Sequence, residues 1–77
     1  MAATLTDPLH FRAQLERVFS LMSDGKPRTL AEISLATGDP QASVSARLRD
    51  LRKEKFGGYV VTRTYIADGI FTYALGA

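Results

Sequence analysis

The tripeptide Gly38-Asp39-Pro40 constrains the fold more than any other part of the sequence, because it ends one helix and begins another. Glycine adopts the left-handed conformation in which helices commonly end. Aspartate is a favoured N-cap, and proline is tolerated at the first helical position because its missing N–H has no partner there. The sequence therefore predicts two helices separated by only a tight turn.

The helix before this turn begins at a capping box. Thr29 and Glu32 are spaced so that each side chain can bond a backbone N–H of the other residue. Leu30, Ile33 and Ala36 form the apolar side of this second helix. Two helices joined by a tight turn are the sequence signature of a helix-turn-helix motif.

A first helix is predicted from Asp7-Pro8, where the cap and proline recur, to Ser23-Asp24-Gly25, where glycine ends it. Apolar residues recur at helical spacing between these ends. We interpret them as the core side of the helix: Phe11, Leu15, Val18, Phe19 and Met22. Lys26-Pro27-Arg28 then predicts a short extended link to the second helix.

The third helix is predicted from about residue 40 to residue 55 and is ended by Phe56-Gly57-Gly58. At about 100° per residue its residues divide into an inner and an outer side. The inner side holds Val44, Leu48 and Leu51. The outer strip holds Ala42, Ala46, Arg49 and Lys53, flanked by Ser43, Ser45, Asp50 and Arg52. This strip is therefore small at its N-terminal end and basic at its C-terminal end.

Residues 59–75 change to β-branched and aromatic types, which favour strands. They predict strands at 59–66 and 70–75, joined by the three-residue loop Ala67-Asp68-Gly69 with Gly69 at a positive φ. Pairing Ile66 with Ile70 fixes the register. The face expected to cover the helices holds Val61, Arg63, Tyr65, Phe71, Tyr73 and Leu75. The opposite face holds Val60, Thr62, Thr64, Ile66, Ile70, Thr72 and Ala74.

The chain has 77 residues and no cysteine. This length allows one domain, 1–77 with an ordered core at about 7–75, which no disulfide or thiolate metal site can brace. With 45% hydrophobic residues it can form a compact fold, mainly α-helical with a small β-hairpin (α+β). No apolar run approaches the roughly 18 residues of a membrane span, and the N-terminus lacks the pattern of a signal peptide. We therefore expect a cytoplasmic protein.

The net charge of +2 decides little, but its distribution is uneven. Residues 41–56 contain five basic and two acidic side chains, whereas the remaining segments are neutral or slightly acidic. A positive excess confined to one element is typical of proteins that bind a polyanion. On charge alone, a solvated helix face is the alternative.

Three helices followed by a hairpin resemble the winged helix-turn-helix DNA-binding family, in particular small bacterial and phage proteins with an Arg-Lys-x-Lys-Phe-Gly-Gly stretch before the wing. Segments 25–33 and 36–53 are similar to the family's second helix and to its turn and recognition helix, and the likeness covers roughly residues 9–75. The resemblance implies three helices with a C-terminal two-stranded wing. It also implies that helix 40–55 enters the major groove of double-stranded DNA, in a transcription regulator or an excisionase-like factor located at the nucleoid.

The third helix supplies most of the residues that we expect to bind DNA. Gln41 can hydrogen-bond an adenine edge in two places, and the small residues beside it let the helix approach the bases closely. The basic residues further along are placed to meet phosphates. The expected contacts are Gln41, Ala42, Ser43, Ser45, Ala46, Arg47, Arg49, Arg52, Lys53 and, in the hairpin, Arg63.

The hairpin departs from the family in one respect. Wings often carry a basic tip, whereas the tip here is Ala67-Asp68-Gly69. Arg63 is the sole cation of the hairpin, and stacking on Tyr73 is at least as good an expectation for it as a phosphate contact. We therefore expect the wing to contribute weakly or not at all.

An enzyme is not expected, because His10 is the only histidine and no cysteine or carboxylate cluster accompanies it. The sequence predicts no catalytic residue, metal, cofactor, membrane contact or small-molecule substrate. A winged-helix protein–protein interaction module and a replication-initiation accessory domain remain open as alternatives. A monomer of this size recognises about one half-site, so specific binding would need a homodimer or cooperative assembly on DNA.

Overall fold

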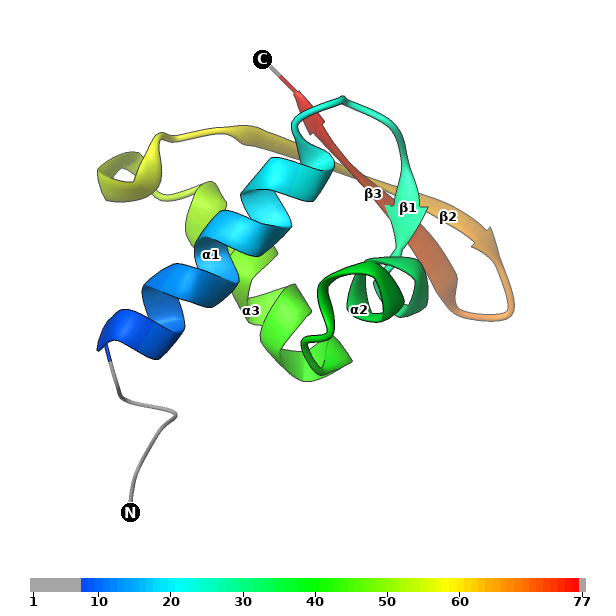
Figure 1. Cartoon of the computed structure of the whole chain (residues 1–77). Helices are drawn as coiled ribbons and strands as arrows, with labels where there is room; N and C mark the ends of the chain where they lie inside the picture. Colours follow the sequence, from blue (N-terminus) through cyan, green and yellow to red (C-terminus); the bar gives the residue numbers. More distant parts are fainter. Residues whose placement is uncertain (1–7, 77) are drawn as a thin grey trace.

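The computed structural model describes residues 8–76, which form three α-helices and one small antiparallel sheet (Figure 1). The helices are α1 (Pro8–Met22), α2 (Leu30–Thr37) and α3 (Gln41–Leu51), followed by a short 3-10 helix, η2 (Glu54–Phe56). The strands are β1 (Arg28–Thr29), β2 (Val60–Ala67) and β3 (Ile70–Gly76). The predicted α+β class is confirmed. Asp7, the predicted cap of the first helix, lies outside the described residues.

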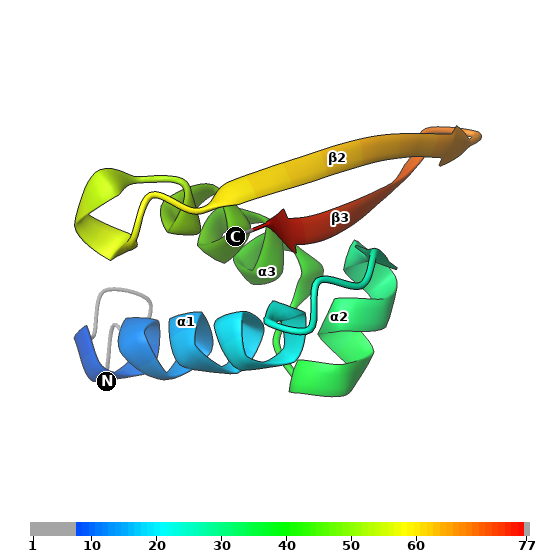
Figure 2. The same ribbon diagram turned by 90° about the horizontal axis from the view of Figure 1, so that it is seen from above.

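α3 lies between α1 and the β2–β3 hairpin, so its two sides face different neighbours (Figure 2). The core that joins these elements consists of apolar side chains that are at most 8% exposed. They are Val18, Met22, Ile33, Val44, Leu48, Leu51 and Leu75. The predicted inner side of the third helix, Val44 with Leu48 and Leu51, is therefore confirmed.

The start of α2 is the predicted capping box. Thr29 Oγ1 accepts the Glu32 backbone N–H at 3.1 Å, and the Thr29 N–H donates to the Glu32 carboxylate at 2.8 Å. Gly38 ends the helix at a φ of 80°, in the left-handed region. The N-cap position of α3 falls on Pro40 rather than on Asp39, so the turn between the helices consists of residues 38–40.

α3 ends at Leu51, earlier than the predicted end at Lys55. Lys53 is extended, and the chain then changes direction into η2. A tertiary contact accounts for the change, because the ring of Phe56 packs 5.5 Å from that of Phe11 on α1. A continuous helix would carry Phe56 away from α1, so packing overrides the helical propensity of the charged residues before it.

β3 is the central strand of the sheet, with β1 on one side and β2 on the other. The pairs from Val61 with Leu75 to Tyr65 with Phe71 have the predicted register. The hairpin is therefore aligned as expected over most of its length.

The turn of the hairpin is tighter than predicted. Ala67, not Ile66, pairs with Ile70, which leaves an irregularity in β2 before the turn. The loop is the two residues Asp68 and Gly69, at φ values of 52° and 76°. Two central residues at positive φ match the right-handed twist of the strands, which explains why a two-residue turn replaces the predicted three.

A third strand corrects the prediction of a two-stranded sheet. Arg28 pairs with Tyr73 and Thr29 pairs with Thr72, so the predicted extended link before α2 becomes β1. This pairing ties the start of α2 to the middle of the hairpin.

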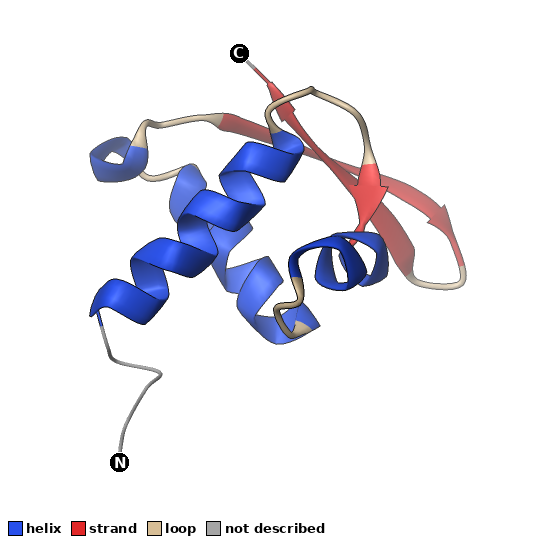
Figure 3. Ribbon diagram, in the orientation of Figure 1, coloured by secondary structure: helices blue, strands red, loops and turns tan. Residues whose placement is uncertain are grey.

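The base of the hairpin covers the helices as predicted, but its outer end does not. Val61, Tyr73 and Leu75 pack at the core. Tyr65 is 58% exposed, and its ring contacts Phe71 edge-on at 5.3 Å between centroids. The outer end of the hairpin projects beyond the helices (Figure 3), which is why Tyr65 finds no helix to cover.

Candidate nucleic-acid interface

A groove of about 370 Å³ lies between α3 and the hairpin, and we call it the arginine groove. Arg49 and Arg52 reach it from the C-terminal end of α3, and Arg63 reaches it from β2. Ser45 and Tyr73 also line it, and no carboxylate does. The groove therefore brings together four of the predicted DNA contacts.

Helical spacing places Ser45, Arg49 and Arg52 at successive turns on the hairpin side of α3. Arg63 is the register partner of Tyr73, but its guanidinium lies over the ring of Phe71, 4.6 Å from the centroid. The prediction that Arg63 stacks on Tyr73 is therefore wrong. The ring under its guanidinium is that of Phe71, two residues earlier on β3. Stacking of this kind holds a guanidinium flat and leaves the N–H groups at its edge free to donate.

The arginines of the groove have no counter-charge. Within residues 8–76 none of the three takes part in an ion pair. Three other arginines each bond an aspartate: Arg17 with Asp39 at 2.6 Å, Arg28 with Asp24 at 2.8 Å and Arg47 with Asp50 at 3.0 Å. The aspartates thus neutralise arginines elsewhere in the molecule and leave the arginine groove positive.

Arg47 is among the residues expected to meet phosphates, but the structure places it on the α1 side of α3. Its side chain is only 17% exposed. It donates to Gln14 Oε1 at 3.1 Å and lies 4.3 Å from the centroid of the Phe11 ring. Asp50, which we expected to flank the outer strip, is buried beside it. Arg47 therefore lies apart from the arginine groove and joins α3 to α1.

Lys53 also differs from its expected position, because α3 ends before it. Its ammonium nitrogen lies 3.2 Å from Asp50 Oδ1, so it belongs to the same cluster as Arg47. The helical alignment of Lys53 with Arg49 on one outer strip is wrong for this reason. The contact leaves Lys53 with a carboxylate neighbour that the groove arginines lack.

The other predicted contacts lie at the N-terminal end of α3. Gln41 and Ala42 are exposed, whereas Ser43, Ser45 and Ala46 are half-buried. Gln41 also lines a second cavity, of about 300 Å³, between the start of α2 and β3. The residues expected to contact bases and those expected to contact phosphates therefore occupy opposite ends of the same helix.

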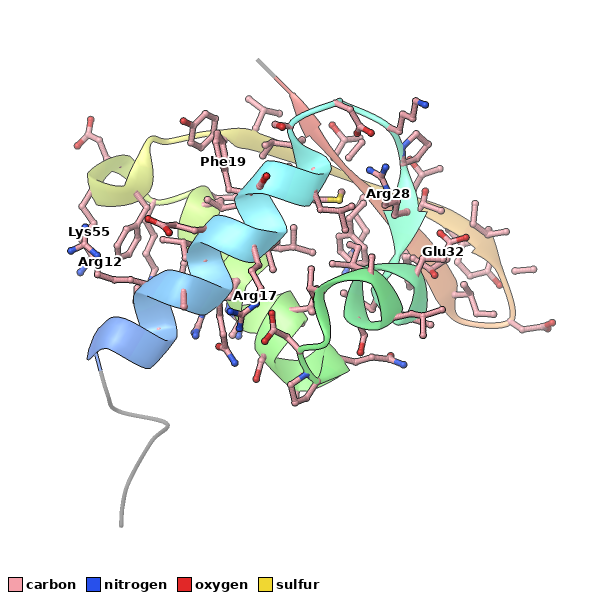
Figure 4. The ribbon with its side chains drawn as sticks, in the orientation of Figure 1. Arg12, Arg17, Phe19, Arg28, Glu32 and Lys55 are labelled. Carbon is pink, nitrogen blue, oxygen red and sulfur yellow. The ribbon has the colours of Figure 1, made fainter. Side chains whose placement is uncertain are left out.

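An ion pair that the sequence did not predict fixes the turn before α3. Arg17 reaches from α1 toward this turn (Figure 4) and donates to both carboxylate oxygens of Asp39, at 3.0 and 2.6 Å. Asp39 is 5% exposed, and its hydrogen bond raises the pKa of Arg17. Nothing in the spacing of these two residues marks the contact. The pair connects α1 to the turn that positions Gln41.

A second ion pair holds the end of α1 to β1. Arg28 donates to the two oxygens of Asp24 at 2.9 and 2.8 Å. These bonds, together with one from the Lys26 backbone N–H, lower the pKa of Asp24 well below its usual range. Asp24 therefore stays ionised and keeps Arg28 compensated.

The residues that the structure describes hold no group of three His, Cys, Asp or Glu side chains able to bind a metal ion. In the same part of the chain, no helix has both the length and the apolar character that crossing a membrane requires. The side chain of His10 lies outside the described part. Comparisons of the chain with protein-family models, curated proteins and solved structures found no match.

Proposed function

We propose that the chain binds double-stranded DNA as a winged helix-turn-helix module, with α3 in the major groove and the arginine groove on the sugar–phosphate backbone. One observation carries the proposal: Arg49, Arg52 and Arg63 converge from two separate elements on a groove without a carboxylate. In this arrangement the β2–β3 hairpin is the wing. A small transcription regulator or an excisionase-like architectural factor would use such a module.

The groove has the chemistry that a phosphate requires. A guanidinium presents its N–H donors in a planar fork that matches two phosphate oxygens, and its charge strengthens each bond. The stack on Phe71 keeps the fork of Arg63 in place, and Ser45 adds a hydroxyl. Because no carboxylate competes for these donors, a phosphate is the partner that satisfies them. Through Arg63 the hairpin would bind the sugar–phosphate backbone of DNA, although the tip of the hairpin is acidic.

The N-terminal turn of α3 is suited to contacts with base edges. The major groove is about 12 Å wide, and the small side chains of Ala42 and Ser43 allow a helix to lie close to the bases. The exposed amide of Gln41 can pair with N6 and N7 of adenine. The partial positive charge of a helix N-terminus also favours nearby phosphates. Sequence preference would then arise at Gln41, and affinity at the arginine groove.

A protein-interaction module is the second candidate, and a different cavity favours it. About 400 Å³ lies between α1 and η2, lined by Phe11, Leu15 and Phe56 together with the charged side chains of Arg12, Glu16 and Lys55. Figure 4 shows Arg12 and Lys55 close to each other at this end of the molecule. Aromatic rings beside two cations and one carboxylate suit a partner that offers an apolar side chain with a carboxylate next to it. This cavity lies on the α1 side of α3, so its occupation would leave the arginine groove free.

A salt titration of duplex binding tests the DNA proposal. If the three arginines each neutralise one phosphate, log K should fall against log salt with a slope of about −2.7, from about −0.9 per phosphate. The triple variant Arg49→Gln, Arg52→Gln, Arg63→Gln should lose about that much slope. Arg12→Gln removes an exposed cation on the α1 side and should keep the parent slope. A parent protein whose binding does not respond to salt would refute the proposal.

A further inference from the structure

We propose that the cavity beside Gln41 receives the C5-methyl edge of a thymine, so that this end of the interface distinguishes thymine from unmethylated pyrimidines. The inference rests on the proposed DNA binding and adds the chemical group that the domain prefers. The cavity is lined by residues from the start of α2, from the start of α3 and from the part of β3 that follows the hairpin turn. Its volume of about 300 Å³ exceeds that of a methyl group and leaves room for the edge of a pyrimidine ring.

Most of the wall of this cavity is apolar. α2 contributes Leu30 and Ala31, and β3 contributes Ile70 and Phe71. No charged side chain lines it. The hydroxyl oxygen of Thr29 at its edge already accepts a backbone N–H of α2. The lining thus differs from that of the arginine groove, which contains three guanidinium groups.

Gln41 places a polar group beside these apolar walls. Its side chain is exposed and forms no hydrogen bond within residues 8–76, so its amide is available to a ligand. Tyr73 lines both this cavity and the arginine groove, which makes the two neighbours along the hairpin side of α3. A duplex held by the arginines would therefore present its major groove to Gln41 and to the apolar cavity.

An A·T pair offers the matching groups in the major groove. Adenine presents N6 and N7, which an amide binds in two places, and thymine presents the C5 methyl. Guanine and unmodified cytosine offer no apolar group on that side. The amide of Gln41 and the apolar cavity therefore correspond to the two halves of one A·T pair or of two neighbouring ones.

The experiment uses the duplex that the protein selects from a random-sequence pool. This duplex is resynthesised with each thymine replaced, one at a time, by deoxyuridine. The replacement removes the methyl group and keeps every hydrogen-bonding group of the base. Burial of one methyl corresponds to about a fourfold change in affinity, so we expect one or two thymines at which deoxyuridine weakens binding by about fourfold.

Two matched protein variants assign that effect to the cavity. Ile70→Thr makes its wall more polar and should bring the ratio of thymine to deoxyuridine affinity close to one at the same position. Val60→Thr is the control, because Val60 is similarly exposed, 59% against 51% for Ile70, and lies at the other end of the hairpin. It should keep the fourfold ratio. Both residues are more than half exposed, so both variants should fold, and a circular-dichroism melt checks this.

Each other outcome has a definite meaning. Equal affinity for thymine and deoxyuridine at every position, in a parent that binds its selected duplex, overturns the methyl recognition and leaves DNA binding standing. A fourfold ratio that persists in Ile70→Thr shows that the methyl group is recognised elsewhere, and the assignment to this cavity is then wrong. If no duplex binds at any salt concentration, the proposed function fails and this inference fails with it.

Discussion

The two sides of α3 carry arginines that differ in burial and in charge partners. On the α1 side, Arg47 is 17% exposed and is held by Asp50 and Gln14. On the hairpin side, Arg49 and Arg52 face a groove that no carboxylate lines. Asp50 lies against Arg47 and outside the lining of the arginine groove, so two sides of one helix that both carry arginines differ in charge compensation.

The same division extends to the rest of the described chain. Arg17 and Arg28 have their N–H donors occupied by aspartates and connect α1 to neighbouring segments. Arg63 is stacked on a ring instead, so its position is fixed while its charge remains uncancelled. The net charge of the chain is only +2, but the lining of the arginine groove holds three cations and no carboxylate. The local positive charge at the groove is therefore larger than the net charge indicates.

The largest effect is expected on the stability of the fold, from a substitution on the α1 side of α3. Asp50→Ala removes the counter-charge of Arg47, which is too buried to be fully hydrated. We expect the free energy of unfolding to fall by about 3 kcal/mol, against a total of about 4–12 kcal/mol for a domain of this size. Urea denaturation measures the change. Arg49→Ala is the control, because removing an exposed cation should alter stability by less than about 0.5 kcal/mol. Equal stability of Asp50→Ala and the parent would show that the cluster does not hold α3 to α1.

The next effect belongs to the hairpin side and concerns binding instead of folding. Arg49→Ala should weaken duplex binding about eightfold at 0.1 M salt and reduce the salt slope by about 0.9, with little dependence on sequence. Fluorescence anisotropy on the selected duplex and on a scrambled one measures both quantities. If Arg49→Ala changed the preferred sequence instead, the middle of α3, and not its N-terminal turn, would contact the bases.

A smaller effect is expected at the ion pair between α1 and β1. Arg28→Ala removes the main cause of the lowered pKa of Asp24, which should rise toward its ordinary value of 3.8. Because the pKa is lowered in the folded state, the stability that this carboxylate contributes is complete above about pH 4 and is lost as the pH falls further. NMR titration of the Asp24 carboxyl measures the shift. An unchanged titration would mean that Arg28 does not hold Asp24 in solution.

The smallest effect is expected at the hairpin tip. Asp68→Asn removes the negative charge and keeps a residue type that tolerates the positive φ of 52°. We expect duplex affinity to stay the same or to rise slightly, because the tip carries no cation and any nearby phosphate is repelled by Asp68. Binding measured beside the parent at low salt decides this. A clear loss of affinity in the folded variant would give Asp68 a direct contact with DNA.

Local signals account for what the sequence could predict. The capping box at Thr29 and Glu32, the glycine that ends α2 and the apolar side of α3 depend on residues close together in the chain. The register from Val61 to Tyr65 followed from placing the hairpin turn around Asp68-Gly69, although the pair next to the turn was wrong. Of the site, the sequence could identify α3 and its exposed basic residues, because helical spacing alone puts Arg49 on the outside.

The remaining features depend on neighbours that are distant in sequence. Arg47 and Asp50 have the spacing of an exposed pair on a helix surface, and only the packing of Gln14 on α1 shows that they face inward. The early end of α3 depends on Phe56 reaching α1. The arginine groove likewise needs the hairpin to place Arg63 beside α3, which no local pattern reveals.

The short strand β1 has a consequence for the order in which the molecule assembles. It pairs Arg28 with Tyr73 and Thr29 with Thr72, so it joins a segment that precedes α2 to the last strand of the described chain. Contacts between distant segments are slow to form, because the entropy of closing a long loop must be overcome first. We therefore expect the helices to pack before the hairpin docks. A chain caught at that stage, on the ribosome or after partial unfolding, would already have α3, but Arg63 would not yet lie beside Arg49 and Arg52, so the arginine groove would be missing.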